Sequence, residues 1–179
     1  MKSAPIPNNE KLRLMTLDRY QVLDTEAEQC FDDITKLASV ICNTPISLVS
    51  LIDSNRQWFK SKVGLEANET SRDISFCGHA ILKDDVFIVE NALLDDRFSD
   101  NPLVVGEPSI RFYAGAPLKT SKGYKIGTLC IIDSQPREFR QQDIEILEKV
   151  ASDIVFLIDY PQLKYHGKSY FQTLSNHFH

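Results

Sequence analysis

The chain has 179 residues, of which 42% are hydrophobic, and a formal net charge of −5. This length fits one domain with terminal extensions, and the apolar fraction is enough for a packed core. The interspersed charges argue against a nucleic-acid partner, and no apolar run is long enough to span a membrane. Because the start of the chain also lacks the apolar segment of a signal peptide, we expect a cytoplasmic protein.

A first helix is predicted from Glu10 to about Tyr20, after the capping sequence Asn8-Asn9. Its apolar residues form no single stripe. Such a helix suits contacts both with its own domain and with a partner, but it equally suits a weakly attached arm.

A second helix is predicted from a capping box to Asn43. In the box, Thr25-Glu26-Ala27-Glu28, the Thr25 hydroxyl accepts from a backbone N–H and Glu28 reaches back. Helical spacing gives this helix one buried face, which carries Phe31, Ile34, Leu37, Ala38 and Ile41. The Thr44-Pro45 step ends the helix.

Two strands follow, over residues 46–52 and 57–63. The first is apolar on both alternating faces, which is typical of a central strand in a covered sheet. The turn composition Asp53-Ser54-Asn55-Arg56 between the strands predicts an antiparallel hairpin.

The next stretch alternates between loops and short elements. Residues 64–75 are polar and predict a loop, residues 75–82 predict a short helix, and residues 86–89 predict a third strand. Residues 91–109 are rich in Asp, Pro and Gly and too long for a simple turn. A loop of this length in a compact domain is often functional.

Two adjacent strands are predicted over residues 110–118 and 126–133. One face of the first strand carries Arg111, Tyr113 and Gly115. A guanidinium, a phenol and a missing side chain on one sheet face indicate the floor of a pocket, so the pattern favours a small-molecule sensor.

A last helix, from about Phe139 to Tyr160, has a wide apolar surface, because Ile146, Val150, Phe156 and Leu157 flank its main stripe. We expect this excess to form a homodimer contact, and a wider groove within the chain is the alternative. Pro161 ends the helix. The chain thus divides into an arm and helix (1–22), a domain (23–160) and a polar tail (161–179), in which His177-x-His179 is too weak a signal to predict a metal site.

The four cysteines, Cys30, Cys42, Cys77 and Cys130, form no CxxC pair, so we expect free thiols and no structural zinc site. Cys77 and His79 are not expected to form a catalytic dyad, because residues two apart point to nearly opposite sides of a helix. Near a helix start, Cys77 is either a reactive thiol of lowered pKa or a small buried residue.

Six motifs between residues 20 and 160 occur in a characteristic order. They are Leu23-Asp24-Thr25, Ile52-Asp53 with Arg56-Gln57-Trp58-Phe59, Ser75-Phe76-Cys77-Gly78-His79-Ala80-Ile81, Asp95-Asp96-Arg97-Phe98, Arg111-Phe112-Tyr113-Ala114-Gly115-Ala116-Pro117-Leu118 and Gly127-Thr128-Leu129-Cys130-Ile131-Ile132-Asp133. With them the chain resembles a GAF domain, the sensory module of bacterial signalling proteins and cyclic-nucleotide phosphodiesterases. The resemblance implies an α+β fold with an antiparallel sheet of five or six strands. The N- and C-terminal helices would pack on one face, and the short helix and long loop would cover a cavity on the other.

The resemblance places the candidate ligand-binding residues around that cavity: Phe76, Cys77, His79, Arg97, Phe98, Arg111, Tyr113 and Gly115. Arg111 either holds a carboxylate or phosphate or pairs with an aspartate of the 95–100 segment, and Arg97 has the same two interpretations. Tyr113 either contacts the ligand or packs, and Phe76 and Phe98 form apolar walls. His79 is either a structural residue or a haem ligand or pH sensor.

The resemblance assigns no cofactor. In phytochrome-like domains a histidine directly follows the bilin cysteine, whereas Gly78 separates Cys77 from His79 here. Cyclic-nucleotide GAF domains carry an Asn-Lys…Phe…Asp-Glu signature, whereas Asn91 is followed by Ala92. Neither ligand is therefore expected.

These features favour a non-catalytic sensory or regulatory domain. A small molecule would order the 91–109 loop and the 76–82 helix, and the terminal helices would change a homodimer contact or a contact with a separate output protein. One alternative is a thiol-based redox enzyme of the free methionine sulfoxide reductase type, which needs a second thiol beside Cys77. Another is a ligand-free structural dimerisation domain whose cavity is filled by its own side chains.

Overall fold

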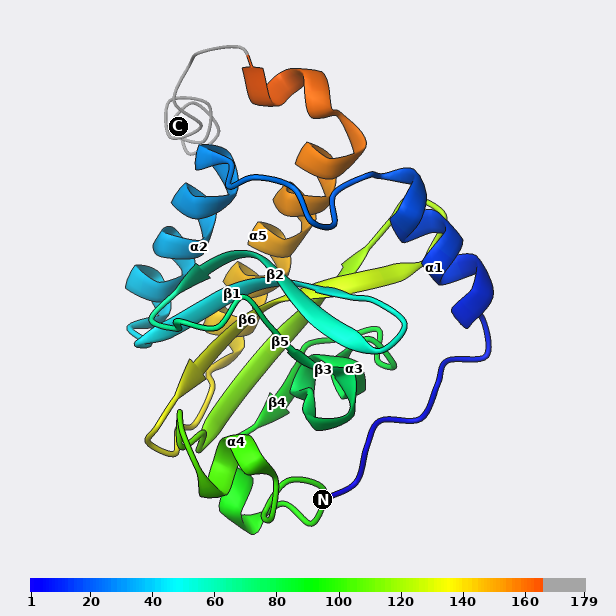
Figure 1. Cartoon of the computed structure of the whole chain (residues 1–179). Helices are drawn as coiled ribbons and strands as arrows, with labels where there is room; N and C mark the ends of the chain where they lie inside the picture. Colours follow the sequence, from blue (N-terminus) through cyan, green and yellow to red (C-terminus); the bar gives the residue numbers. More distant parts are fainter. Residues whose placement is uncertain (166–179) are drawn as a thin grey trace.

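The computed structural model describes residues 1–165 and contains a six-stranded antiparallel sheet in the order β3-β2-β1-β6-β5-β4 (Figure 1). The strands are β1 (Ile46–Ile52), β2 (Arg56–Val63), β3 (Glu69–Ser71), β4 (Phe87–Val89), β5 (Phe112–Lys119) and β6 (Lys125–Asp133). The α+β fold with an antiparallel sheet is therefore confirmed, and the predicted hairpin is the β1–β2 pair.

Helices lie on both faces of this sheet (Figure 1). They are α1 (Glu10–Arg19), α2 (Gln29–Cys42), α3 (Phe76–Ala80), α4 (Pro102–Val105) and α5 (Gln141–Asp159), with 3-10 turns η1 (Arg72–Ile74), η2 (Ala92–Leu94) and η3 (Pro161–Tyr165). The contacts of α2 with β2 and of α5 with β5 define one face, and α3 contacts β5 and β6 on the other. Over residues 1–165, no helix combines the length and the apolar character that crossing a membrane requires.

Helix α5 buries most of its apolar surface within the chain. Its main stripe packs on the sheet beside α2, and Leu157, expected to lie outside that stripe, is only 3% exposed. Ile146 and Val150 are half-buried, whereas Phe156 is 50% exposed. The wide intramolecular groove thus accounts for much of the predicted excess, and Phe156 remains on the surface near the end of the helix.

The predicted capping box at the start of α2 is wrong. The helix begins at Gln29, and neither Thr25 nor Glu28 caps it with a side chain. Both residues instead contact the buried ammonium of Lys60 on β2, which donates to Thr25 Oγ1 at 2.7 Å and pairs with Glu28 at 2.8 Å. Because a buried charge needs partners, this long-range pairing outweighs the local cap.

Two segments expected to be loops contain short elements. The polar stretch 64–75 forms the edge strand β3 and η1, and the 91–109 stretch contains η2 and α4. These turns are too short to show a hydrophobic period, so sequence pattern gives little sign of them. Most of the 161–179 tail, including the histidines considered for metal binding, lies outside the described residues.

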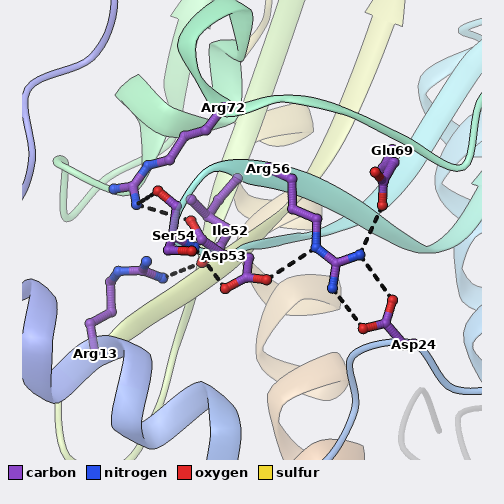
Figure 2. A network of polar contacts seen from close by, with 8 residues as sticks. All are labelled: Arg13, Asp24, Ile52, Asp53, Ser54, Arg56, Glu69 and Arg72. Atoms are coloured by element: carbon purple, nitrogen blue, oxygen red, sulfur yellow. Dashed lines mark hydrogen bonds and ion pairs between the residues drawn. The ribbon is translucent and has the colours of Figure 1, made fainter.

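Two arginines attach α1 and η1 to the end of β1. Figure 2 shows Arg13 of α1 and Arg72 of η1 directed at the backbone of residues 52–54, where they donate to the carbonyls of Ile52 (2.6 Å) and Asp53 (3.0 Å) respectively. The carboxylate of Glu10 joins them, because it accepts from Arg13 at 2.8 Å and from Arg72 at 2.6 Å. Arg13 is 1% exposed, so α1 is held by a buried polar contact and is more than a loosely attached arm.

The neighbouring Arg56 contacts the same turn through Asp53. Its guanidinium pairs with Asp24, Asp53 and Glu69, so it connects the segment before α2 to the β1–β2 turn and to β3 (Figure 2). Asp24 is largely exposed, so water weakens this pair. The contacts of the partly buried Glu10 with two buried arginines are therefore the stronger part of the network.

We expect Glu10→Gln to lower the free energy of unfolding by about 2 kcal/mol at neutral pH, because two buried guanidinium groups lose their counter-charge. Burial alone would raise the pKa of Glu10, but hydrogen bonds from Arg13 and Arg72 lower it from 4.5 to about 2. The carboxylate therefore stabilises the fold fully above about pH 4.5, and this stabilisation is lost as the pH falls toward 2. Thermal melts of both proteins between pH 7 and pH 3 should show the difference shrinking.

The matched control is Glu148→Gln on the exposed side of α5, which should melt like the parent at every pH. Equal melting temperatures of the parent and Glu10→Gln at pH 7 would contradict the role of this network.

Candidate functional site

Helix α3 is fixed over the sheet by a serine at its start. Ser75 Oγ accepts from the backbone N–H of Gly78 at 2.9 Å, which caps the helix, and donates to Gln57 Oε1 on β2 at 2.7 Å. Beneath the helix the sheet carries a row of small residues. Ser50 of β1 lies opposite Thr128 of β6, and Cys130 of β6 lies opposite Gly115 of β5. The predicted site residues of α3 therefore approach the sheet closely.

Aromatic rings fill the space between α3 and the sheet. Phe76 of α3 stacks on Phe98 with ring centroids 3.9 Å apart, and the Tyr113 ring of β5 lies 5.2 Å from Phe76. Phe87 of β4 lies 6.0 Å from Tyr113. All four rings are at most 6% exposed, so in this structure the predicted pocket is occupied by the protein's own side chains.

The missing side chain at Gly115 makes room for Tyr113. A Cβ added at Gly115 would come within 2.2 Å of the Tyr113 hydroxyl oxygen. The glycine therefore lets the tyrosine ring fold back over its own strand. The predicted face with Tyr113 and Gly115 exists, but Arg111 precedes β5, which begins at Phe112.

Two cysteines meet beneath Tyr113. The sulfur atoms of Cys77 on α3 and Cys130 on β6 are 3.8 Å apart, and the Tyr113 hydroxyl donates to Cys77 Sγ at 3.1 Å. Ser50 and Thr128 are fully buried on the same face, and their hydroxyls have no hydrogen-bond partner in the described structure.

The surroundings of the two thiols shift their pKa values in opposite directions. Burial would raise the pKa of Cys77, but the neighbouring Cys130 thiol and the nearby hydroxyl groups of Thr128, Tyr113 and Ser50 lower it to about 7. Burial, followed by the contact with Cys77, raises the pKa of Cys130 well above its usual value. Burial also raises the pKa of Tyr113, so the phenol stays protonated and can donate.

His79 contacts the start of the chain. Its Nε2 lies 2.9 Å from the carbonyl oxygen of Lys2, and its ring meets Phe98 edge-on at 4.9 Å. Burial lowers the pKa of His79, so the ring is neutral at physiological pH. Cys77 and His79 thus have different partners, in agreement with the helix-geometry argument against a dyad.

The guanidinium groups of the two candidate arginines contact the segment between η2 and β5. Arg97 donates to both oxygens of Asp95, at 2.8 and 2.6 Å, and its guanidinium lies 4.8 Å from the Phe87 ring centroid. Arg111 donates to the backbone carbonyls of Val104 (2.9 Å) and Ile110 (3.0 Å). Arg97 therefore forms the expected ion pair, whereas Arg111 uses backbone oxygens in place of an aspartate.

The first residues of the chain cross over α3. The Lys2 N–H donates to the Arg97 carbonyl at 3.0 Å, the Met1 ammonium pairs with Asp100, and the Ala4 methyl group lies against Gly78. Figure 1 shows this N-terminal arm (residues 1–9) running from α1 to the vicinity of α4. The sequence predicted an arm at this end of the chain but not its contacts with α3 and the loop, because residues 1–9 carry no periodic or motif signal.

Hollows of ligand size lie on other parts of the surface. One of about 460 Å³ lies beside α1 and is lined by Asp18, Asp24 and Arg56 among others. Another of about 380 Å³ lies between the N-terminal arm and Ile81 and Leu82. None of the predicted site residues lines either hollow, so a ligand on the α3 face would have to separate the aromatic rings.

The family profile of the GAF domain matches residues 26–158, so the chain belongs to the GAF domain family. Among individual proteins, a cyclic di-GMP phosphodiesterase of Pseudomonas aeruginosa is 45% identical over 152 residues, which is 84% of this chain. That match spans only 26% of the phosphodiesterase. The chain is therefore similar to a segment of that protein and not to the whole of it.

Solved structures of two relatives show the same fold. The GAF domain of an Acinetobacter phosphoenolpyruvate-protein phosphotransferase has a TM-score of 0.60 at 17% identity, covering 85% of this chain and 96% of that one. The free methionine-R-sulfoxide reductase of Neisseria meningitidis, solved with its substrate, has a TM-score of 0.62 at 16% identity and covers 91% and 99%. At such identities the similarity concerns the fold alone.

We expect Gly115→Ala to destabilise the fold by about 1 to 3 kcal/mol, because the new methyl group overlaps the buried Tyr113 ring. The cost should fall when the same substitution is made in a Tyr113→Leu background, which removes the overlapping atoms. Chemical denaturation of the parent, both single variants and the double variant measures this coupling. Additive effects would show that Tyr113 does not occupy the space above Gly115.

Proposed function

We propose that the chain is a sensory or regulatory domain, which binds a small molecule on the α3 face and changes the contacts of its terminal helices. The contacts of the N-terminal arm are the main support for this proposal. The arm hydrogen-bonds to His79 of α3 and to the loop at Arg97, and it continues directly into α1. A displacement of α3 or of this loop therefore pulls on the first terminal helix.

The chemistry of the α3 face favours an uncharged ligand with a flat ring. The guanidinium groups of Arg97 and Arg111 already hold partners within the chain, and His79 is neutral. The remaining groups are rings, hydroxyls and thiols, and among the rings Phe76 and Phe98 are nearly parallel, with an angle of 8° between them. A flat ligand that separated these two rings would replace one stacking contact with two.

The same movement would reach both ends of the folded domain. Tyr20, directly after α1, donates its hydroxyl to Asp159 at the end of α5 at 2.6 Å. Leu12 and Met15 on α1 and Phe156 on α5 are 45–50% exposed. These apolar groups support a homodimer through the terminal helices, whose geometry would change when α1 moves.

The output in this proposal is cyclic di-GMP turnover. The similarity to a segment of a cyclic di-GMP phosphodiesterase supports regulation of such an enzyme, whether in one polypeptide or as a separate output protein. The ligand would act by preferring one arrangement of α3 and the loop over the other.

Native mass spectrometry of the protein purified from its own host tests both parts. We expect a dimer that retains a small molecule and releases it on denaturation. Phe98→Leu, which removes one of the stacked rings, should lose the molecule. The matched variant Phe139→Leu, whose ring contacts Phe112 on the other face, should keep it. A monomer without a retained molecule would contradict the proposal.

A second function is a ligand-free structural dimerisation domain, and the filled space above Gly115 favours it. In the same measurement it predicts a dimer with no retained molecule, together with unchanged dimerisation in Phe98→Leu.

A third function is a thiol-based redox enzyme of the free methionine sulfoxide reductase type, and the Cys77–Cys130 pair favours it. With dithiothreitol as reductant, we then expect turnover of free methionine-R-sulfoxide that Cys77→Ala abolishes. No turnover by the parent protein, or full turnover by the variant, would exclude this function.

A further inference from the structure

The pair Cys77 and Cys130 joins elements that are distant in the sequence. Cys77 lies on α3 and Cys130 on β6, so a bond between them would connect the covering helix to the centre of the sheet. Their sulfur atoms are 3.8 Å apart, whereas a disulfide requires about 2.05 Å. A closing movement of less than 2 Å is within the range that small side-chain and helix shifts supply.

Hydroxyl groups lie on the sheet face beside the Cys77–Cys130 pair. The Tyr113 hydroxyl donates to Cys77 Sγ directly, and the buried hydroxyls of Ser50 and Thr128, opposite each other on β1 and β6, have no hydrogen-bond partner among the described residues. A buried hydroxyl without a partner is costly, so these groups are available to donate to a thiolate. Such an arrangement stabilises a negative charge on Cys77.

The other cysteines have different surroundings. Cys130 carries a raised pKa and keeps its proton, which suits a thiol that reacts second. Burial, followed by the nearby carboxylate of Asp143, raises the pKa of Cys42 to about 11. Tyr113 makes the pair asymmetric, because its hydroxyl donates to Cys77 Sγ and would stabilise a thiolate there, while Cys130 is held 3.8 Å away as the second thiol.

We propose that Cys77 and Cys130 form a peroxide-oxidisable pair, in which Cys77 reacts with a hydroperoxide and Cys130 then closes a disulfide. The Cys77 thiolate attacks one peroxide oxygen, the O–O bond breaks, and Cys77 becomes a sulfenic acid while the leaving oxygen takes a proton to give water or an alcohol. The Cys130 sulfur then attacks the Cys77 sulfur and releases the hydroxyl group as water with the Cys130 proton. Two thiols are oxidised by two electrons, and one peroxide is reduced.

The enclosure of the pair restricts the oxidant. Cys77 is 2% exposed and Cys130 is fully buried. Hydrogen peroxide is small enough to enter during brief openings of α3, whereas bulky thiol reagents are not. The reaction is independent of the proposed function, but the disulfide would pull α3 toward β6 and thereby also act on the N-terminal arm through His79.

The test is oxidation of the folded protein with hydrogen peroxide, followed by intact mass and peptide mapping. We expect a mass loss of two hydrogen atoms and a peptide that joins Cys77 to Cys130. A large maleimide reagent should leave both residues unmodified in the folded protein. A disulfide that involves Cys30 or Cys42, or oxidation of the pair only after denaturation, would overturn the proposal.

Variants separate the two steps. In Cys130→Ala the sulfenic acid of Cys77 should persist and be trapped by dimedone, and in Cys77→Ala the residue Cys130 should stay reduced. The double variant Cys30→Ala/Cys42→Ala should form the disulfide like the parent. Oxidation of Cys130 in Cys77→Ala at the rate of the parent would show that Cys77 is not the nucleophile.

The hydroxyl groups are tested by Thr128→Val and Ser50→Ala, which should slow sulfenic acid formation by about tenfold while near-ultraviolet circular dichroism stays unchanged. The matched control is Ser47→Ala on the opposite face of β1, because Ser47 is equally buried and also lacks a partner in the described structure. An equal rate of sulfenic acid formation in all three variants would show that the hydroxyl groups of Ser50 and Thr128 do not stabilise the Cys77 thiolate.

Discussion

The α3 face depends on a row of small side chains across the middle of the sheet. Ser50, Thr128, Cys130 and Gly115 leave space above β1, β6 and β5 that larger residues would fill. Because protein interiors are close-packed, something must occupy this space. Here the occupants are the Tyr113 ring and helix α3, and their close approach brings the two thiols together. The close packing of the rings and the sulfur pair both follow from that row.

Several arginines of this chain act as cross-links within the fold. Arg13, Arg72 and Arg111 each donate to backbone carbonyls at the ends of strands or short helices. An arginine suits this role because its planar donors reach several acceptors at once. A guanidinium already held in this way is not available to bind an anion without breaking the fold locally. The α3 face consequently offers rings, hydroxyls and thiols in place of charge.

Much of the fold could be predicted from the sequence, because the long elements carry clear periodicity. Strand β1 was placed at its observed ends, and α5 to within two residues at each end. The failures have a common physical origin in long-range contacts. Lys60 lies far along the chain from Thr25 but removes it from the helix cap, and Arg111 turns toward a carbonyl of α4, a helix that pattern analysis did not detect.

The candidate site was predicted only in part. Local motifs identified Phe76, Cys77 and Tyr113, which the structure brings together. The partner thiol could not be assigned, because strand alternation places Cys130 on one of two faces and only the register of β6 against β5 decides which. The available signal was that Cys130 lies on the same strand face as Thr128 and Ile132. Using that signal would have required knowing that this face is the one beneath α3.

The N-terminal arm has a practical consequence for work with the protein. Extra residues joined ahead of Met1 would turn its ammonium group into a neutral amide and remove the charge that pairs with Asp100. An affinity tag or fusion partner at that end would also compete with the backbone contact between Lys2 and Arg97. Protein intended for binding or redox assays is therefore better purified without an N-terminal extension, since a tag there alters the segment that links α3 to α1.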